Sequence, residues 1–287
     1  MPVCLFASDL HGHVERYRKL FDTLKRVRPA AVFIGGDLLP SASLLLSSSG
    51  SQHSDFIKAF LTGELRRLRE EMGTTYPRIF LILGNDDGRL AEAAIVSAEA
   101  EGLCEYAQGR KIIFSGYSVF GYAYVPPTPF MLKDWEKYDV SRYVDPGCVS
   151  PEEGVRSLAV AGDVIRFSTI QIDLDLLTEN EDLEKAVFLF HSPPYQTLLD
   201  RAALDETSID HVPLDVHVGS IAIQRFIKER QPMLTLHGHV HESARLSGSW
   251  RDRIGSTHLF SAAHDGVELA LIRFDLEDLN GATRELL

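Results

Sequence analysis

Short apolar runs alternate with longer segments of helical periodicity in the first third of the chain. The runs Val3–Ala7, Ala30–Ile34 and Ile79–Leu83 are continuously apolar, which is typical of buried strands. After each run, apolar residues recur every three or four positions. This spacing predicts helices over Val14–Val27, Phe56–Met72 and Leu90–Ala100. The strand–helix alternation indicates an α/β protein with parallel strands joined by crossover helices.

The pattern changes in the rest of the chain. Lys111–Val125 alternates and contains two glycines, which favours antiparallel strands. We further predict a helix over about Pro151–Ala161, an alternating strand region over Val164–Leu174, buried strands over Ala186–Phe190 and Met233–Leu236, an amphipathic helix over Ser220–Arg230, and closing strands over Ser256–Ser261 and Gly266–Phe274. There is no internal repeat and no clear linker, so we expect one domain spanning residues 1–287.

Two segments fit neither pattern. Pro40–Ser54 is rich in serine and is not expected to form regular structure; it is either a rim over a site or a tolerated insertion. The proline-rich segment from Pro126 to Trp135 should be extended. Its aromatic residues could stack on a base or anchor the loop, and we favour the anchor.

Polar residues with metal-binding side chains follow five of the apolar runs. In chain order they are Asp9 and His11, Asp37, Asn85, His191, and finally His239 and His241. Each has a plainer interpretation when taken alone: Asp9 could cap a helix, and Asp37 could belong to a turn. Five such coincidences at strand ends are hard to attribute to turns, because carboxyl ends of strands are the usual place for chemistry in α/β sheets.

Composition limits the binding partners and the cellular location to be expected. The net charge is −12, which argues against a surface that binds duplex nucleic acid. The three cysteines, Cys4, Cys104 and Cys148, are odd in number and far apart, which favours a reducing cytoplasm over a disulfide framework. The N-terminus has no signal-peptide pattern, and no apolar stretch approaches the ~20 residues of a membrane span. The oligomeric state stays open, a homodimer included.

These motifs together resemble those of the calcineurin-like metallophosphoesterases. The family pattern appears as Asp9-Leu10-His11, Gly36-Asp37, Gly84-Asn85-Asp86-Asp87, His191 and Gly238-His239-Val240-His241. The resemblance runs through nearly the whole chain in order. It implies a four-layer fold of two packed mixed β-sheets flanked by helices.

The resemblance also implies two divalent metal ions. Asp9, His11 and His241 would hold one, Asn85, His191 and His239 the other, and Asp37 would bridge them. Nitrogen and oxygen donors without thiolate suit Mn, Fe, Zn, Ni or Co, with Mn favoured. The expected activity is hydrolysis of a phosphate mono- or diester, in a small molecule or nucleotide, by a hydroxide that bridges the metals. We assign Asp37, Asp86 and His191 to catalysis.

One position departs from the family pattern. Many relatives carry a histidine directly after the asparagine, where it can assist the leaving group, and here the residue is Asp86. An aspartate ionised at neutral pH is a poor proton donor, so we expect good leaving groups to be preferred, or His13 or His217 to supply the proton. A surface or helix-cap role for either histidine is equally open. Asp87 matches an acidic position that could orient a ligand histidine.

Other functions also fit the pattern. A protein-binding scaffold that has lost catalysis is one, although all seven ligand positions carry competent side chains. A nuclease and a cyclic-nucleotide phosphodiesterase are others. The acidic balance weighs against the nuclease.

Overall fold

The computed structural model describes residues 2–41, 56–209 and 211–287. Most of the serine-rich segment Pro40–Ser54 therefore lies outside the described residues. Within them the chain forms two mixed sheets of six strands each, together with a two-stranded ribbon of β8 (Ser208–Ile209) and β9 (Val212–Pro213). This confirms the predicted α/β fold of two mixed sheets.

The first sheet contains the N-terminal strands in the order β14-β13-β1-β2-β3-β4. Its strands are β1 (Val3–Ala7), β2 (Ala31–Gly35), β3 (Arg78–Ile82), β4 (Glu105–Tyr106), β13 (Ala270–Asp275) and β14 (Asp278–Leu286). Strands β1 to β4 are mutually parallel, as the crossover pattern predicts, whereas β13 and β14 add antiparallel at one edge.

The second sheet has the order β11-β12-β10-β7-β6-β5. Its strands are β5 (Lys111–Phe114), β6 (Tyr117–Tyr122), β7 (Ala186–Phe190), β10 (Leu234–His237), β11 (Arg251–Ile254) and β12 (Thr257–Ser261). The central strand β10 runs parallel to both β7 and β12. Strands β5 and β6 form the predicted antiparallel pair.

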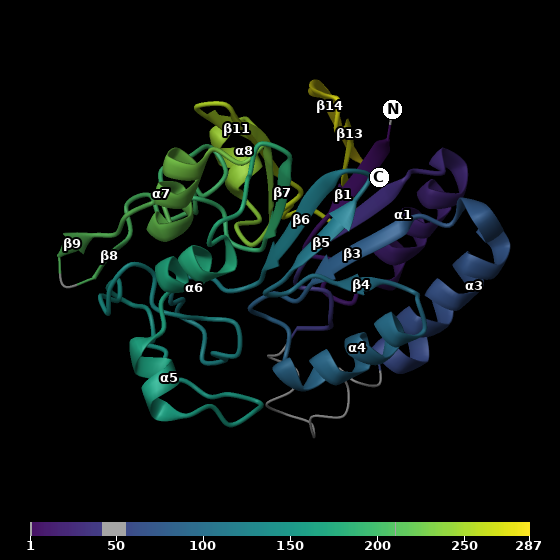
Figure 1. The fold of residues 1–287 in the computed structure, drawn as a ribbon. Coiled ribbons are helices and arrows are strands. Elements are labelled where there is room, and N and C mark those ends of the chain that lie inside the picture. The colour runs from purple at the N-terminus through teal and green to yellow at the C-terminus, as the bar shows by residue number, and fades with distance from the viewer. Residues whose placement is uncertain (1, 42–55, 210) are drawn as a thin grey trace.

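Helices cover the outer faces of the two sheets (Figure 1). Beside the first sheet lie α1 (Val14–Val27), α3 (Thr62–Met72) and α4 (Glu92–Ala100), with short turns of helix at Ile57–Leu61, Gly73–Thr75 and Arg89–Ala91. Beside the second lie α6 (Ile170–Leu177) and α7 (Ile221–Arg230); α5 (Gly162–Phe167) and α8 (Ser243–Ser247) are short. None of the helices in the described part of the chain combines the length and apolar character needed to cross a bilayer.

Aromatic stacking marks two hydrophobic clusters. The larger cluster packs α1, α3 and α4 on the first sheet and also fills the space between the sheets; Phe33 and Phe80 stack there at 5.2 Å. The smaller cluster packs α6 and α7 on the second sheet, where Phe188 contacts both Phe120 and Phe226. Both clusters hold the sheets in fixed register, so the strand ends have defined positions.

Two predictions in the middle of the chain were wrong. Pro151–Ala161 is irregular, and the expected strand region over Val164–Leu174 is helical in α5 and α6. Ile170 and Leu174 are buried because they lie four residues apart on one helix face, whereas Ile172 between them is exposed. The same residues also alternate along the sequence, so the pattern fits both periods.

Strand β14 is absent from the sequence-based prediction, because its sequence is mostly polar and exposed at a sheet edge.

The proline-rich segment ends at a buried aromatic residue. Trp135 is buried against Tyr124, with ring centroids 5.3 Å apart, and Arg89 lies over its ring. The anchor interpretation of the proline-rich segment therefore holds for Trp135.

Candidate metal centre

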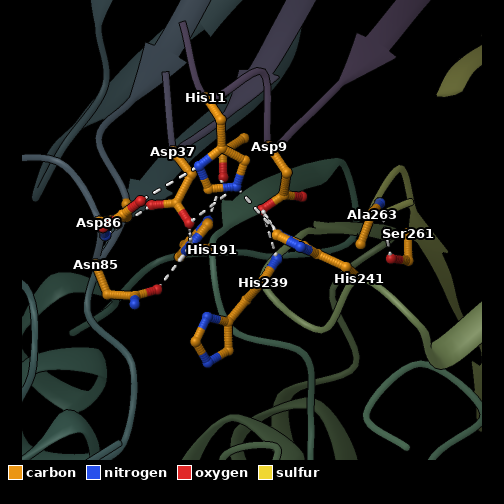
Figure 2. Close-up of polar contacts among 12 residues, drawn as sticks. Asp9, His11, Asp37, Asn85, Asp86, His191, His239, His241, Ser261 and Ala263 are labelled. Atoms are coloured by element: carbon orange, nitrogen blue, oxygen red, sulfur yellow. Dashed lines mark hydrogen bonds and ion pairs between the residues drawn. The ribbon is translucent and has the colours of Figure 1, made fainter. Parts of the chain in front are cut away.

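The seven predicted ligand residues lie together where the two sheets meet (Figure 2). They follow the carboxyl ends of three neighbouring strands of the first sheet and two of the second: Asp9 and His11 after β1, Asp37 after β2, Asn85 after β3, His191 after β7, and His239 and His241 after β10. Parallel neighbours place their carboxyl ends at one edge of a sheet, which brings these residues together.

One group of four side chains faces a common point. Nε2 of His11 and Nε2 of His241 are 3.1 Å apart, and Oδ1 of Asp9 is 3.4 Å from the His241 nitrogen. Oδ2 of Asp37 is 3.8 Å from Nε2 of His11. Potential ligand atoms of all four residues lie within 4.8 Å of one another. Ligands about 2.0–2.2 Å from a cation are spaced by about 3–4 Å, so this group matches a metal site.

A second group shares Asp37. Nε2 of His191 lies 3.0 Å from Oδ1 of Asn85 and 3.3 Å from Oδ2 of Asp37. Nδ1 of His191 is 2.7 Å from the carbonyl oxygen of Gly35, which can only accept, so Nδ1 carries the hydrogen. The Nε2 lone pair of the neutral ring therefore points at two oxygen acceptors, an arrangement that a proton or a cation must satisfy.

His239 differs from the other histidines. Its main-chain N–H donates to Oδ1 of Asp9 at 3.0 Å, whereas its ring is directed away from Asp9 and His241 (Figure 2). The ring lies 5.2 Å from that of His191, centroid to centroid. Burial and the neighbouring His191 lower the pKa of His239 to about 3, so its ring is neutral and keeps a lone pair that can bind a cation.

Carboxylates and imidazoles at the site shift one another's pKa values. Burial would lower the pKa of His11, but Asp86, Asp37 and Asp9 outweigh it and raise that pKa to about 9. Burial likewise opposes protonation of His191, whose pKa is raised to about 9 chiefly by Asp37. In turn His191 and His11 overcome the effect of burial and hold the pKa of Asp37 well below its usual range. Without a cation, these imidazoles take up protons to balance buried carboxylates.

Unusual backbone conformations aim the side chains. Asp9, His11, Asp37 and His239 all have positive φ, between 46° and 73°. Such conformations cost about 1–3 kcal/mol each and persist where surrounding bonds enforce them. Here the N–H of Asp9 donates to the Gly36 carbonyl at 3.0 Å, and the N–H of His11 donates to the Asp37 carbonyl at 2.8 Å. The two turns thus hold each other.

The acidic residues after Asn85 have separate partners. Oδ2 of Asp87 accepts the main-chain N–H groups of Leu38 and Gly84, and its Oδ1 accepts that of Leu39, all within 3.0 Å. Asp87 therefore braces the Asp37 turn, and its carboxylate bonds to no histidine among the described residues, contrary to the sequence-based expectation. It is Asp86 whose Oδ2 lies 3.4 Å from Nδ1 of His11.

The structure also bears on the helix-cap and surface roles considered for Asp9, His13 and His217. His13, not Asp9, is the N-cap residue of α1, and its side chain makes no capping bond. Asp9 is instead buried among the ligands. His217 donates through Nδ1 to the buried carboxylate of Asp200, at 2.8 Å.

Sequence reasoning missed Arg16. Its guanidinium donates to the main-chain carbonyl oxygens of Asp9 at 2.7 Å and of Gly266 at 2.5 Å, so it ties the β1 turn to a loop near the C-terminus. Arg16 stands among ordinary residues of a predicted amphipathic helix. No local signal in the sequence sets it apart from the other arginines of α1.

The donor set fits divalent cations. Oδ2 of Asp9 is buried and accepts no hydrogen bond from any described residue. An unpaired buried carboxylate oxygen is costly, and a bound cation would satisfy it. The two groups of nitrogen and oxygen donors, joined by Asp37 and free of thiolate, suit borderline divalent metals.

A two-sheet α/β sandwich with aspartates and histidines at the strand ends of both sheets defines the metallophosphoesterase class of proteins. The model of the calcineurin-like phosphoesterase family matches residues 3–243, which is most of the chain. The chain therefore belongs to the calcineurin-like phosphoesterase family. The residues after 243 complete both sheets with their outer strands.

Solved structures agree on the fold. The protein TT1561 of Thermus thermophilus superposes with a TM-score of 0.58 at 16% identity, covering 99% of this chain and 98% of that one. A second solved structure has a TM-score of 0.59 at 15% identity with the same coverage. At these identities the likeness concerns the fold alone. None of the curated proteins compared with the sequence matches it.

Proposed function

We propose that this chain is a phosphoesterase that binds two divalent cations, with Mn favoured, and hydrolyses phosphate mono- or diesters. The observation that carries the proposal is the division of seven side chains into two groups that share one carboxylate. Asp9, His11 and His241 would hold one cation, and Asn85, His191 and His239 the other. Asp37 lies between the groups, close to a nitrogen of each.

When bound, the two cations would lower the pKa of a water between them and offset negative charge on the phosphate oxygens. The protein residues have matching tasks. The Asp37 carboxylate would help to hold both cations, and its Oδ1 is fixed by the main-chain N–H of Asp86 at 2.8 Å. His191 keeps Nε2 directed at the site because its Nδ1–H is bound by the Gly35 carbonyl.

The substrate would be a small phosphate ester or a nucleotide. The net charge of −12 repels phosphate at long range, so local cations are needed to attract it. We also retain a cytoplasmic location as a proposal; it is supported by the three cysteines, which are unpaired.

Metal analysis combined with a substrate screen tests the proposal. The purified protein is analysed for bound elements, stripped with chelator and reloaded with Mn, Ni or Zn. Aryl phosphate monoesters, aryl diesters, cyclic nucleotides and single-stranded DNA are then offered. We expect metal-dependent hydrolysis of a mono- or diester. Metal binding without any turnover would instead favour the scaffold, and cleavage of DNA alone would favour the nuclease.

A further inference from the structure

Asp86 occupies the position at which many relatives have a histidine, but its carboxylate faces a ligand. Oδ2 of Asp86 lies 3.4 Å from Nδ1 of His11, and Figure 2 shows the carboxylate beside that ring. The main-chain N–H of the same residue donates to Oδ1 of Asp37 at 2.8 Å. One residue thus contacts a ligand from each of the two neighbouring turns.

The tautomer of His11 follows from these contacts. Its Nε2 faces Nε2 of His241 at 3.1 Å and must present a lone pair if a cation lies between them. The hydrogen of the neutral ring then sits on Nδ1, where the Asp86 carboxylate can accept it. This arrangement repeats that of His191, whose Nδ1–H is bound by the Gly35 carbonyl while Nε2 faces the site. In His11 the accepting group is a side chain and can be changed by mutation.

We propose that Asp86 is a positioning residue, which holds His11 in the tautomer and orientation needed to bind a cation, and that it is not the proton donor to the leaving group. The inference rests on the proposed function, because it assumes that His11 binds a metal. Partners of this kind fix ring orientation and increase the basicity of the ligand, and their loss typically costs 10–100-fold in metal affinity. Because the Asp86 carboxylate accepts the Nδ1–H of His11, it acts there as a hydrogen-bond acceptor and is not placed to donate a proton.

Titration of the metal-free protein with Mn²⁺ alone, followed calorimetrically, gives the direct test. We expect Asp86→Ala to weaken one of two Mn²⁺ sites about 10–100-fold. Asp86→Asn keeps the size of the side chain and an oxygen that can accept, but removes the charge. The loss of Mn²⁺ affinity in Asp86→Asn should therefore be smaller than in Asp86→Ala. Asp163→Asn is the matched control, because it removes one negative charge from an exposed position on α5. Its Mn²⁺ affinity should stay within about twofold of wild type.

The visible spectrum of bound Co²⁺ adds a readout that does not depend on turnover. We expect Asp86→Ala to change the band intensity, because the His11 ring is free to turn. A proton-donor role predicts the opposite pattern: unchanged Mn²⁺ affinity and Co²⁺ spectrum, and a rate loss that grows with the leaving-group pKa of a series of aryl phosphates. That pattern would overturn the inference.

The outcomes separate this inference from the proposed function. If the wild-type protein binds no divalent cation, the proposed function itself fails. If wild type binds two Mn²⁺ ions and hydrolyses its ester, but Asp86→Ala and Asp86→Asn bind both ions equally tightly, only the role of Asp86 fails. Circular dichroism verifies folding, and Asp86→Asn decides the question if the alanine variant does not fold.

Discussion

The Nε2 atoms of His11 and His241 lie 3.1 Å apart, although 230 positions separate the two residues in the chain. Two imidazole nitrogens at this distance cannot both present lone pairs unless a proton or a cation lies between them. The carboxylates of Asp9 and Asp37 complete the group. A cation here would therefore join β1 and β10, which belong to different sheets.

Metal binding should accordingly stabilise the protein. At a free Mn²⁺ concentration 100 times the dissociation constant, the free energy of unfolding rises by about 2.7 kcal/mol. For a chain of this size we expect a melting temperature roughly 5–10 °C higher in Mn²⁺ than in EDTA, measured by scanning calorimetry. His241→Ala should lose most of this difference, whereas Asp163→Asn should retain it. Equal melting temperatures with and without metal in the wild type would contradict this prediction.

Replacement of Asp37 by asparagine should remove the shared ligand. Asn is the same size and can still accept the N–H of Asp86, so the turn should survive. We expect bound metal to fall from two equivalents toward one and kcat/KM to fall by at least about 100-fold. Elemental analysis and steady-state kinetics measure the two effects. A variant with full metal content and full rate would rule out a bridging role.

Gly238 permits a close approach between the two sheets. A Cβ there would lie 2.1 Å from Oγ of Ser8 and 2.7 Å from Oδ2 of Asp9. We expect Gly238→Ala to lower the free energy of unfolding by about 1–3 kcal/mol in urea melts and to weaken Mn²⁺ binding, because Asp9 must move.

The matched control for this variant is Gly63→Ala on α3, where a Cβ meets nothing within 4 Å. It should be neutral or stabilising by about 0.4–1 kcal/mol, with Mn²⁺ binding intact. Equal effects of the two substitutions would show that the tight packing at Gly238 does not matter.

His237 should make stability depend on pH. It is buried, its Nδ1–H donates to the Ser192 carbonyl and its Nε2 accepts from the Thr235 hydroxyl, so the ring is satisfied when neutral. Burial lowers the pKa of His237 to about 4. The unfolded chain therefore binds more protons below pH ~6.5, and this contribution to stability is lost as the pH falls from about 6.5 to 4.

The loss attributable to His237 should reach about 3 kcal/mol at pH 4. It is measured as the difference between wild type and His237→Gln in urea melts in EDTA from pH 7 to pH 4. The glutamine variant should be less stable at pH 7 but should lose less stability on acidification. Parallel pH profiles for the two proteins would refute the assignment.

The periodicity of the sequence was sufficient for most of the fold. Val14–Val27 was predicted with the bounds that α1 has, because a strong amphipathic pattern is a local property. The prediction from periodicity failed around Ile170 and Leu174, where the apolar pattern fits both a helix and a strand. It also failed at β14, where the strand is polar. There the competing structures differ only in how they pack against the rest of the molecule.

The candidate ligand set could likewise be chosen from the sequence, because its members lie within a few residues of the ends of apolar strands, and those strands are recognisable alone. The supporting contacts could not. That Asp86 faces His11, that Asp87 binds the main-chain N–H of Leu38, and that Arg16 holds the Gly266 carbonyl are facts about groups distant in the chain. Sequence position determined which side chains end the strands. Only the order of strands within a sheet and the stacking of the two sheets decided which atoms meet, because distances between segments depend on the whole packed core.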